Sequence, residues 1–153
     1  MEKIGAGTLT LTTASSYEGG TIVAMGKLVL TDVGGGSVLG TGPLNVEAGG
    51  TLAGNGRVNG DATISGNLSP GNSPGLITFG GNLTLNGGSF TNMELAANTT
   101  PGTDYDAVNV TGNLTDGGTL TVSLINGFSP SRGDSFDLFN VSGTITGLSL
   151  IHI

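Results

Sequence analysis

The chain has 153 residues, of which 30 are glycine and 10% are charged, and it contains neither cysteine nor tryptophan. This composition excludes a disulfide framework and thiolate catalysis, and the glycines lack the strict three-residue period of collagen. The net charge of −7, with four scattered lysines and arginines, argues against nucleic-acid binding, which needs clustered cations, and against nonspecific adhesion to anionic lipid.

Short segments of alternating polar and apolar residues, separated by glycine, occupy the first half of the chain. Residues 8–12 read Thr-Leu-Thr-Leu-Thr, which predicts a strand with both leucines on one face. Similar short strands are predicted within 17–23, 26–30, 42–46, 50–52, 56–58, 61–64 and 66–68. Leu9 is followed 19 residues later by Leu28, and Ile64 is followed 19 residues later by Leu83.

A recurrence of about 20 residues, with several short strands in each period, predicts a parallel β-solenoid. A strand of a few residues cannot bury its apolar side chains alone, whereas coiling stacks each strand about 4.8 Å from its counterpart one turn later. No segment shows a helical apolar period bounded by caps, so we expect essentially no α-helix. We interpret the fold class as all-β, a right-handed parallel β-helix.

The predicted strands lengthen after Pro74, in the segments 88–96, 104–112, 118–125, 135–141 and 143–150. All five phenylalanines lie in this half, so we expect wider, more aromatic turns and a thicker core there. We place a boundary in the turn 69–75. It divides one continuous solenoid into repeat-type turns at 1–69 and a C-terminal continuation or closing region at 70–153. The second region is predicted to be the stable nucleus, with the first half fraying.

The stretch from Gly66 to Leu85 contains two Gly-Asn-Leu units joined by the turn Ser-Pro-Gly-Asn-Ser-Pro-Gly. It resembles the passenger region of bacterial autotransporters, where such a turn followed by a Gly-Asn-Leu-Thr-Leu strand is common near the C-terminal end. Residues 101–112, 118–122 and 133–139 resemble the segment that often closes the β-helix of these passengers before the membrane barrel. The resemblance covers most of the chain.

This resemblance implies a non-catalytic structural stem, carried at the cell surface or secreted from a Gram-negative-type cell, that displays other domains and supports folding during export. The implied partners are flanking segments of the parent chain, namely further β-helix turns and a C-terminal membrane barrel, and end-to-end or edge self-association is a further option. The sequence shows no signal-peptide core and no run of about 20 apolar residues, so we expect no direct membrane insertion. We expect the chain to be a fragment of a longer protein.

We assign no catalytic, cofactor-binding or metal-binding residue from the sequence, and we predict that the chain is not an enzyme. The single histidine, His152, lies one residue from the end and is interpreted as a tail residue rather than a catalytic base. Asp104 and Asp106 have the spacing that would put both carboxylates on one side of a strand, as a paired-acid or weak cation site requires. A turn that leads into a strand explains them more simply. The calcium-binding nonapeptide repeat does not occur.

Three further motifs have structural interpretations. Arg132-Gly133-Asp134 is the tripeptide of integrin ligands, but here it begins a turn. Thr8, Thr10 and Thr12 would suit an ice-binding surface only if the threonines recurred in register on successive turns, and the following segments break that pattern. Asn-x-Ser/Thr sequons, which this composition makes frequent, occur at Asn67, Asn82, Asn98, Asn109, Asn113 and Asn140.

Two other functions stay open as alternatives. The first is a β-helix that binds or cleaves carbohydrate, for which an acidic or aromatic groove would be diagnostic. The chain supplies only Tyr17 and Tyr105 and no tryptophan for stacking on a sugar. The second is an adhesin that binds host proteins through its loops or strand edges.

Overall fold

A computed structural model describes residues 1–31, 34–147 and 150–152, and the described residues form strands and turns without a helix. The strands are β1 Glu2–Lys3, β2 Thr8–Leu11, β3 Thr21–Leu30, β4 Leu44–Gly54, β5 Gly56–Val58, β6 Ala62–Ile64, β7 Asn67–Pro70, β8 Leu76–Phe79, β9 Leu83–Leu85, β10 Phe90–Leu95, β11 Ala107–Val110, β12 Leu114–Asp116, β13 Thr119–Leu124, β14 Phe139–Val141, β15 Ile145–Gly147 and β16 Leu150–His152. The pairings between these strands are parallel, as successive turns of a coil require.

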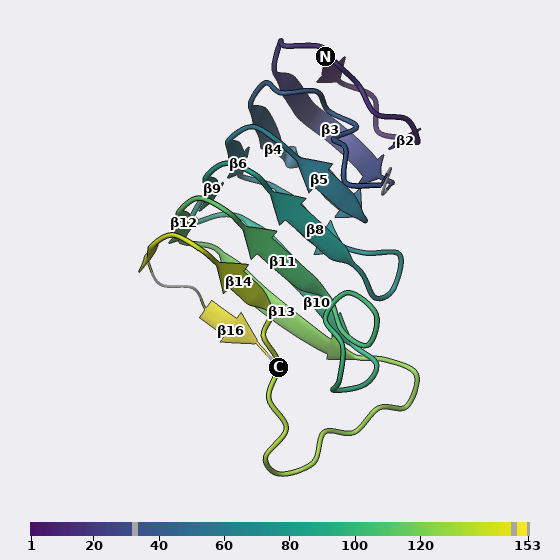
Figure 1. Cartoon of the computed structure of the whole chain (residues 1–153), viewed down its shortest axis with the longest axis vertical. Helices are drawn as coiled ribbons and strands as arrows, with labels where there is room; N and C mark the ends of the chain where they lie inside the picture. Colours follow the sequence, from purple (N-terminus) through teal and green to yellow (C-terminus); the bar gives the residue numbers. More distant parts are fainter. Residues whose placement is uncertain (32–33, 148–149, 153) are drawn as a thin grey trace.

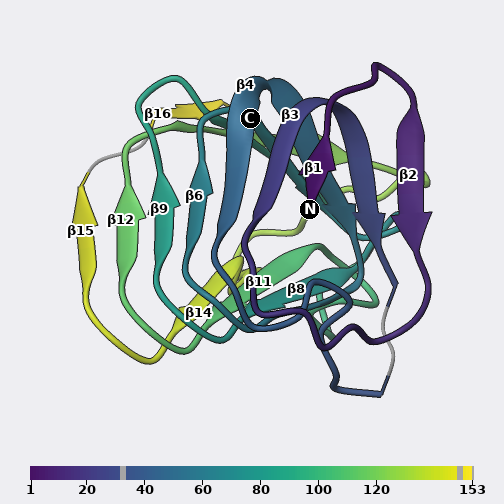
Figure 2. The same ribbon diagram turned by 90° about the horizontal axis from the view of Figure 1, so that it is seen from above.

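The strands coil around the long axis of the molecule and form three faces (Figures 1 and 2). The first face contains β6, β9, β12 and β15, the second contains β7, β10, β13 and β16, and the third is the four-stranded sheet β5-β8-β11-β14. The first two faces belong to one 12-stranded sheet because β3 and β4, of 10 and 11 residues, continue from one face onto the next. The predicted all-β parallel β-helix is therefore confirmed.

The strand register gives the length of each turn near the N-terminal end. Leu9 lies opposite Leu28, as their 19-residue spacing predicts. The second 19-residue spacing is not a register, because Ile64 lies opposite Leu85 rather than Leu83. The turns are longer here, and equivalent corner positions such as Asp61 and Asn82 are 21 residues apart.

The turns widen toward the C-terminal end, as predicted. Asn82 and Asn113 hold equivalent positions 31 residues apart, and so do Asn113 and Thr144. Most of the added residues lie in the connections between the second and third faces, while the strands of each face keep their register.

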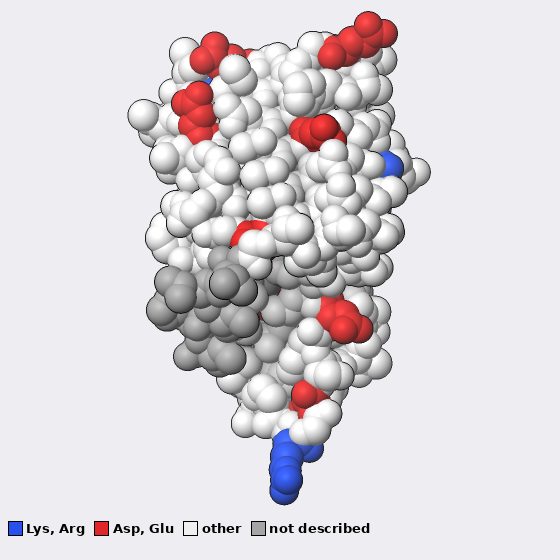
Figure 3. All heavy atoms as spheres, turned by 90° about the vertical axis from the view of Figure 1, so that its left-hand side faces the viewer, with Lys and Arg blue, Asp and Glu red and all other residues white. Residues whose placement is uncertain are grey.

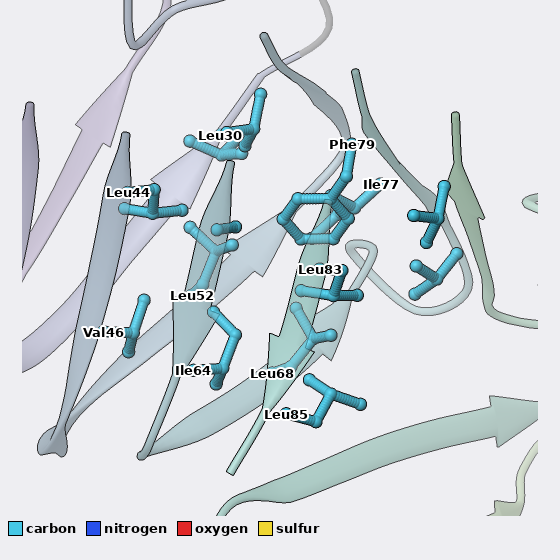
Figure 4. Close-up of a cluster of buried hydrophobic side chains, with 14 of the residues drawn as sticks. Leu30, Leu44, Val46, Leu52, Ile64, Leu68, Ile77, Phe79, Leu83 and Leu85 are labelled. Carbon is cyan, nitrogen blue, oxygen red and sulfur yellow. The ribbon is translucent and has the colours of Figure 1, made fainter. Parts of the chain in front are cut away.

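The core is a column of apolar side chains that point toward the axis (Figure 4). The largest of its fully buried side chains are Leu28, Leu30, Leu39, Leu44, Leu52, Ile64, Leu68, Ile77, Phe79, Leu83, Leu85 and Met93. β3, β4, β8 and β9 each supply two of them and β6, β7 and β10 one each, on the inward side of the strand, because successive side chains of a strand point to opposite faces. Burial of each such side chain contributes about 1.5–3 kcal/mol.

The expected thicker aromatic core is not present, and Phe79 is the only phenylalanine among the buried core residues of the described chain. β10 turns Thr91, Met93 and Leu95 inward. Because side chains alternate along a strand, Phe90 points outward and is 49% exposed. The other phenylalanines belong to the wide turns and to β14.

Stacked glycines mark the corner between the third and first faces. The N–H of Gly112 donates to the carbonyl of Gly81 one turn earlier, at 3.1 Å. A Cβ on Gly112 would lie 2.8 Å from that carbonyl oxygen and 2.6 Å from Oδ1 of Asn82, so only glycine allows the two turns to approach this closely. The units Gly-Asn-Leu-Thr at 81–84 and 112–115 occupy this corner. Residues 66–68, despite reading Gly-Asn-Leu, lie at the corner between the first and second faces.

Candidate functional site

Three connections of increasing length are stacked at the corner between the second and third faces (Figure 1). We call this region the loop corner; it consists of residues 71–75, 96–106 and 125–138, which follow β7, β10 and β13. Loops on a rigid scaffold carry binding functions more often than the strands that they connect. The loop corner also contains the acidic residues and the tripeptide that the sequence singles out, so it is the candidate site.

Asp106 links its own segment of the loop corner to the turn before β8 and to strand β10. Its side chain is buried, with 1% exposure. Oδ1 accepts the N–H of Gly75 at 2.7 Å, and Oδ2 accepts the N–H of Glu94 at 2.8 Å. Burial raises the pKa of Asp106 to about 6, although the two backbone N–H groups act to lower it. Because both oxygens accept backbone N–H groups, the carboxylate links neighbouring turns of the solenoid.

Asp104 engages a different segment from Asp106. Its Oδ2 accepts the N–H of Thr100 at 2.9 Å, and its carbonyl oxygen accepts the N–H groups of Ala96 and Ala97, both at 2.8 Å. Both aspartates precede β11, which begins at Ala107, and lie in the turn that leads into this strand. Each carboxylate therefore organises backbone locally, and the two do not converge on a common reaction centre.

The Arg132-Gly133-Asp134 tripeptide lies in the connection after β13. Oδ2 of Asp134 accepts the N–H of Ser131 at 2.7 Å, and Oδ1 accepts Nδ2 of Asn98 at 2.8 Å. Gly133 has a φ of +103°, which a turn with glycine at this position allows. Arg132 is exposed, and the carboxylate of Asp134 accepts hydrogen bonds within the loop corner.

Aromatic rings pack the widest connection against the one before it. The ring of Phe136 lies edge-to-face with Tyr105 at 5.3 Å between centroids, and with Phe128 at 6.1 Å. Such pairs contribute about 0.5–1.5 kcal/mol beyond the area that they bury. The aromatic side chains expected in the wide turns are therefore present, and they pack in the loop corner rather than in the axial core.

A family comparison bears on the N-terminal end of the solenoid. Residues 1–30 match the family model described as Passenger-associated-transport-repeat. This segment is therefore similar to that repeat. Such repeats are typical of autotransporter passenger regions, so the resemblance to autotransporter passengers is confirmed, and passengers are surface-carried or secreted. No curated protein and no solved structure matches the chain significantly.

The passenger repeat corresponds to one turn of the solenoid and the strand that covers it. It includes β1, β2 and β3. β1 pairs with the first half of β3, and β2 pairs with the second half. Nζ of the buried Lys3 donates to the carbonyl oxygens of Gly5 and Met25, the latter at 2.9 Å. The matched segment lies outside the stretches 66–85, 101–112, 118–122 and 133–139 that carry the resemblance. Passenger repeats of this kind are usually structural, and the comparison identifies no catalytic family.

Sequence reasoning missed a ladder of side chains at the corner between the third and first faces. Oδ1 of Asp61 accepts the N–H of Asn82 at 2.7 Å, and Oδ1 of Asn82 accepts the N–H of Asn113 at 2.9 Å. Oδ1 of Asn113 continues the ladder to the N–H of Thr144 at 2.9 Å. The signal in the sequence was an Asn, Asp or Thr directly after the corner glycine. The sequons at Asn82 and Asn113 thus carry a structural side chain.

Threonines form a column on the first face, and not at residues 8–12, where the sequence suggested an ice-binding threonine ladder. Thr8 and Thr10 lie opposite Lys27 and Val29, so threonine does not continue there. On the first face, four outward positions in register are threonine: Thr63, Thr84, Thr115 and Thr146. Figure 3 shows that most of this side of the molecule carries neither acidic nor basic groups.

A polar cleft of about 330 Å³ lies on the second face beside the turn 71–75. It is lined by Lys27, Ser69, Pro70, Gly71, Asn72, Ser73, Asn92, Glu94 and Asp106. Sequence reasoning did not find this cleft, because its side chains come from β3, β7, β10 and the loop corner, which are brought together only by coiling.

No group of three or more His, Asp or Glu side chains that could hold a metal ion is present among the described residues. The same part of the chain contains no helix of sufficient length and hydropathy to cross a membrane. The side chain of His152 lies outside the described residues.

Proposed function

We propose that the chain is a non-catalytic stem segment of an autotransporter-type passenger, which holds other parts of the parent protein away from the cell. The observation that carries this proposal is the 12-stranded parallel sheet, which continues from the passenger repeat to β16. A coil of stacked parallel strands is stiff along its axis, because bending would break backbone hydrogen bonds on one side.

The same architecture supports a role in folding during export. Each turn of a solenoid is stabilised mainly by its neighbours, so an ordered turn provides a template for the next one to emerge. The proposed partners are flanking parts of the parent chain, namely further β-helix turns and a C-terminal membrane barrel at the outer surface of a Gram-negative-type cell. Self-association through solenoid ends or edges is a further proposed contact.

We retain the division into residues 1–69 and 70–153 as a proposal for how the stem is organised. Two observations support it: the separation of equivalent corner residues increases from 21 to 31, and the loop corner begins at residue 71. In this proposal the first region is a plain spacer, and the second is the wider part that continues or closes the coil.

A surface-display experiment tests the stem function. The chain is placed between an N-terminal epitope and an outer-membrane barrel, and surface epitope is measured in intact cells. Gly112→Val should reduce display severalfold, because a side chain there meets the backbone of the preceding turn. Gly88→Val is the matched control, since a Cβ at Gly88 has no neighbour within 4 Å. Unchanged display of a Gly112→Val chain that circular dichroism shows to be unfolded would contradict the proposal.

A further inference from the structure

We infer that the polar cleft on the second face binds a short, neutral saccharide. The cleft lies between the outward side of β7 and β10 and the turn 71–73, which rises beside these strands. This inference does not depend on the stem function, because a spacer with or without a role in export can carry a binding site on its side.

The cleft brings hydrogen-bond donors and acceptors together from separate turns. Lys27 contributes an ammonium group, Ser69 a hydroxyl, and Asn72 and Asn92 contribute amides. Nδ2 of Asn92 lies 3.4 Å from the Ser69 hydroxyl, a long hydrogen bond that a ligand hydroxyl replaces at little cost. Lys27 forms no ion pair with any described residue, so its ammonium group has all its donors available.

The wall of the cleft is held in place before any ligand binds. Ser73 has a φ of +74°, a left-handed conformation that a residue with a side chain rarely adopts. Such strained residues are enriched at ligand-binding sites, where the surrounding structure fixes them. The Ser73 hydroxyl donates to Oε2 of Glu94 at 2.6 Å, and this contact holds the turn against β10.

Two further side chains hold the C-terminal end of the same turn. Oδ1 of Asn55 accepts the N–H of Leu76 at 2.9 Å, and Oδ1 of the buried Asp106 accepts the N–H of Gly75 at 2.7 Å. Side chains from three separate segments therefore position one short turn. Such preorganisation lowers the entropy that a ligand must lose on binding.

The lining of the cleft selects the class of ligand. Its volume of about 330 Å³ is at the lower end of the range of small-molecule sites, which suits one or two sugar rings. The accessible charges, from Lys27 and Glu94, are one of each sign and give no preference for an anion or a cation. No aromatic ring lines the cleft, so a ligand there is held by hydrogen bonds rather than by stacking. The lining offers amides, a hydroxyl, an ammonium and a carboxylate. A ligand hydroxyl can form a hydrogen bond with each of them, because it both donates and accepts.

The inference concerns binding without cleavage. A glycosidase needs two carboxyl groups free to act on either side of the bond. Here Asp106 has both oxygens engaged by backbone N–H groups, and Glu94 accepts the Ser73 hydroxyl.

An NMR titration of the ¹⁵N-labelled chain tests the inference. The probes are cellobiose, maltose, lactose and N,N′-diacetylchitobiose, and glycerol is the non-saccharide control. We expect at least one disaccharide to shift the backbone amides of 69–73 and 92–94 progressively, with millimolar affinity, and glycerol to leave them unchanged. No shift with any of the four disaccharides, or shifts confined to other surfaces, would overturn the inference.

Two variants and one control locate the site. Asn92→Ala and Lys27→Met each remove an outward lining group, and each should weaken binding at least tenfold. Asn109→Ala is the control, because Asn109 occupies the corresponding kind of position on β11 of the third face and should bind as the unmodified chain does. Each variant must keep the dispersed amide spectrum of the folded chain, and the second cleft variant decides the result if the first does not fold. Equal binding by a folded cleft variant and the control would contradict the assignment.

Discussion

At the scale of single residues, Asp106 shows how one buried carboxylate substitutes for regular strand pairing. The turns at the loop corner differ in length, so their backbone N–H groups do not all meet carbonyl groups of the next turn. Asp106 satisfies two of these donors, those of Gly75 and Glu94, from within the protein. An unpaired buried donor costs about 1–3 kcal/mol, so this single side chain decides whether the corner is stable.

Replacement of Asp106 by alanine should therefore destabilise the fold. Alanine removes both acceptors and leaves the N–H groups of Gly75 and Glu94 without their partner. We expect the free energy of unfolding to fall by about 1–3 kcal/mol for each N–H that is left unpaired, measured by urea denaturation followed by circular dichroism. Asp104→Ala is the control and should cost less, since Asp104 is partly exposed and its partner Thr100 is accessible to water. A larger loss with Asp104→Ala than with Asp106→Ala would contradict this account.

The raised pKa of Asp106 predicts a pH dependence of stability. The pKa is about 6 in the folded chain against an ordinary value of 3.8 for an aspartate carboxyl, so between these values the folded state binds a proton that the unfolded state does not. The contribution of Asp106 therefore makes unfolding harder as pH falls from 7 toward 4, and this stabilisation is lost as pH rises through 6. Urea unfolding at pH 5 and pH 7 should show this difference in the unmodified chain and not in Asp106→Asn. An equal pH dependence in both chains would exclude Asp106 as its source.

At the scale of elements, two kinds of residue define the corner between the third and first faces. A glycine allows neighbouring turns to approach closely, and the polar residue after it accepts the N–H of its equivalent one turn later. The triplet Gly-Asn-Leu alone does not identify that corner, since 66–68 and 81–83 have the same residues at different corners. What distinguishes them is the neighbouring turn. Gly81 is followed 31 residues later by Gly112, with which it forms a hydrogen bond, whereas Gly66 precedes a strand that lies on the second half of β4. Local sequence predicts the strands well, but it does not determine which residues of neighbouring turns lie opposite one another.

The polar ladder at this corner gives a prediction for one element. Asn82→Ala removes the acceptor of the Asn113 N–H and leaves that group to water. The free energy of unfolding should fall by about 0.5–1.5 kcal/mol, and the Asn113 amide should exchange faster with solvent. Asn109→Ala serves as the control, because Asn109 makes no side-chain hydrogen bond with the described residues. Equal protection of the Asn113 amide in both variants would show that the ladder contributes nothing.

At the scale of the whole molecule, the period of the apolar residues was sufficient to predict an all-β parallel solenoid with widening turns. It predicted the Leu9–Leu28 register but misplaced Ile64 by two residues, because turn length changes along the chain and each insertion shifts the later register. The candidate site was less predictable. The aspartates and the tripeptide were visible in the sequence, but the polar cleft is lined by residues as distant in sequence as Lys27 and Glu94.

The distribution of burial also changes where the most stable part of the molecule is expected. The sequence predicts a nucleus from about Pro70 onward, on the basis of its longer strands and phenylalanines. In the structure, Leu28 and Leu52 in the first half are fully buried, whereas Leu120 is 8% exposed and Leu124 is 47% exposed. The deeply buried residues extend from β3 to β12, so we expect the most stable part of the molecule to include turns on both sides of the Pro/Gly turn.

Native-state hydrogen exchange with mass spectrometry tests this revised distribution. Exchange through local opening is slowest where the most apolar surface is buried, so we expect the strongest protection in the segments from β4 to β11. Amides of β3 should be protected at least as strongly as those of β13, because the inward leucines of β3 are more completely buried. If β13 proves more protected than both β3 and β4, then the wide turns and their aromatic packing, rather than axial burial, set the stability of this solenoid.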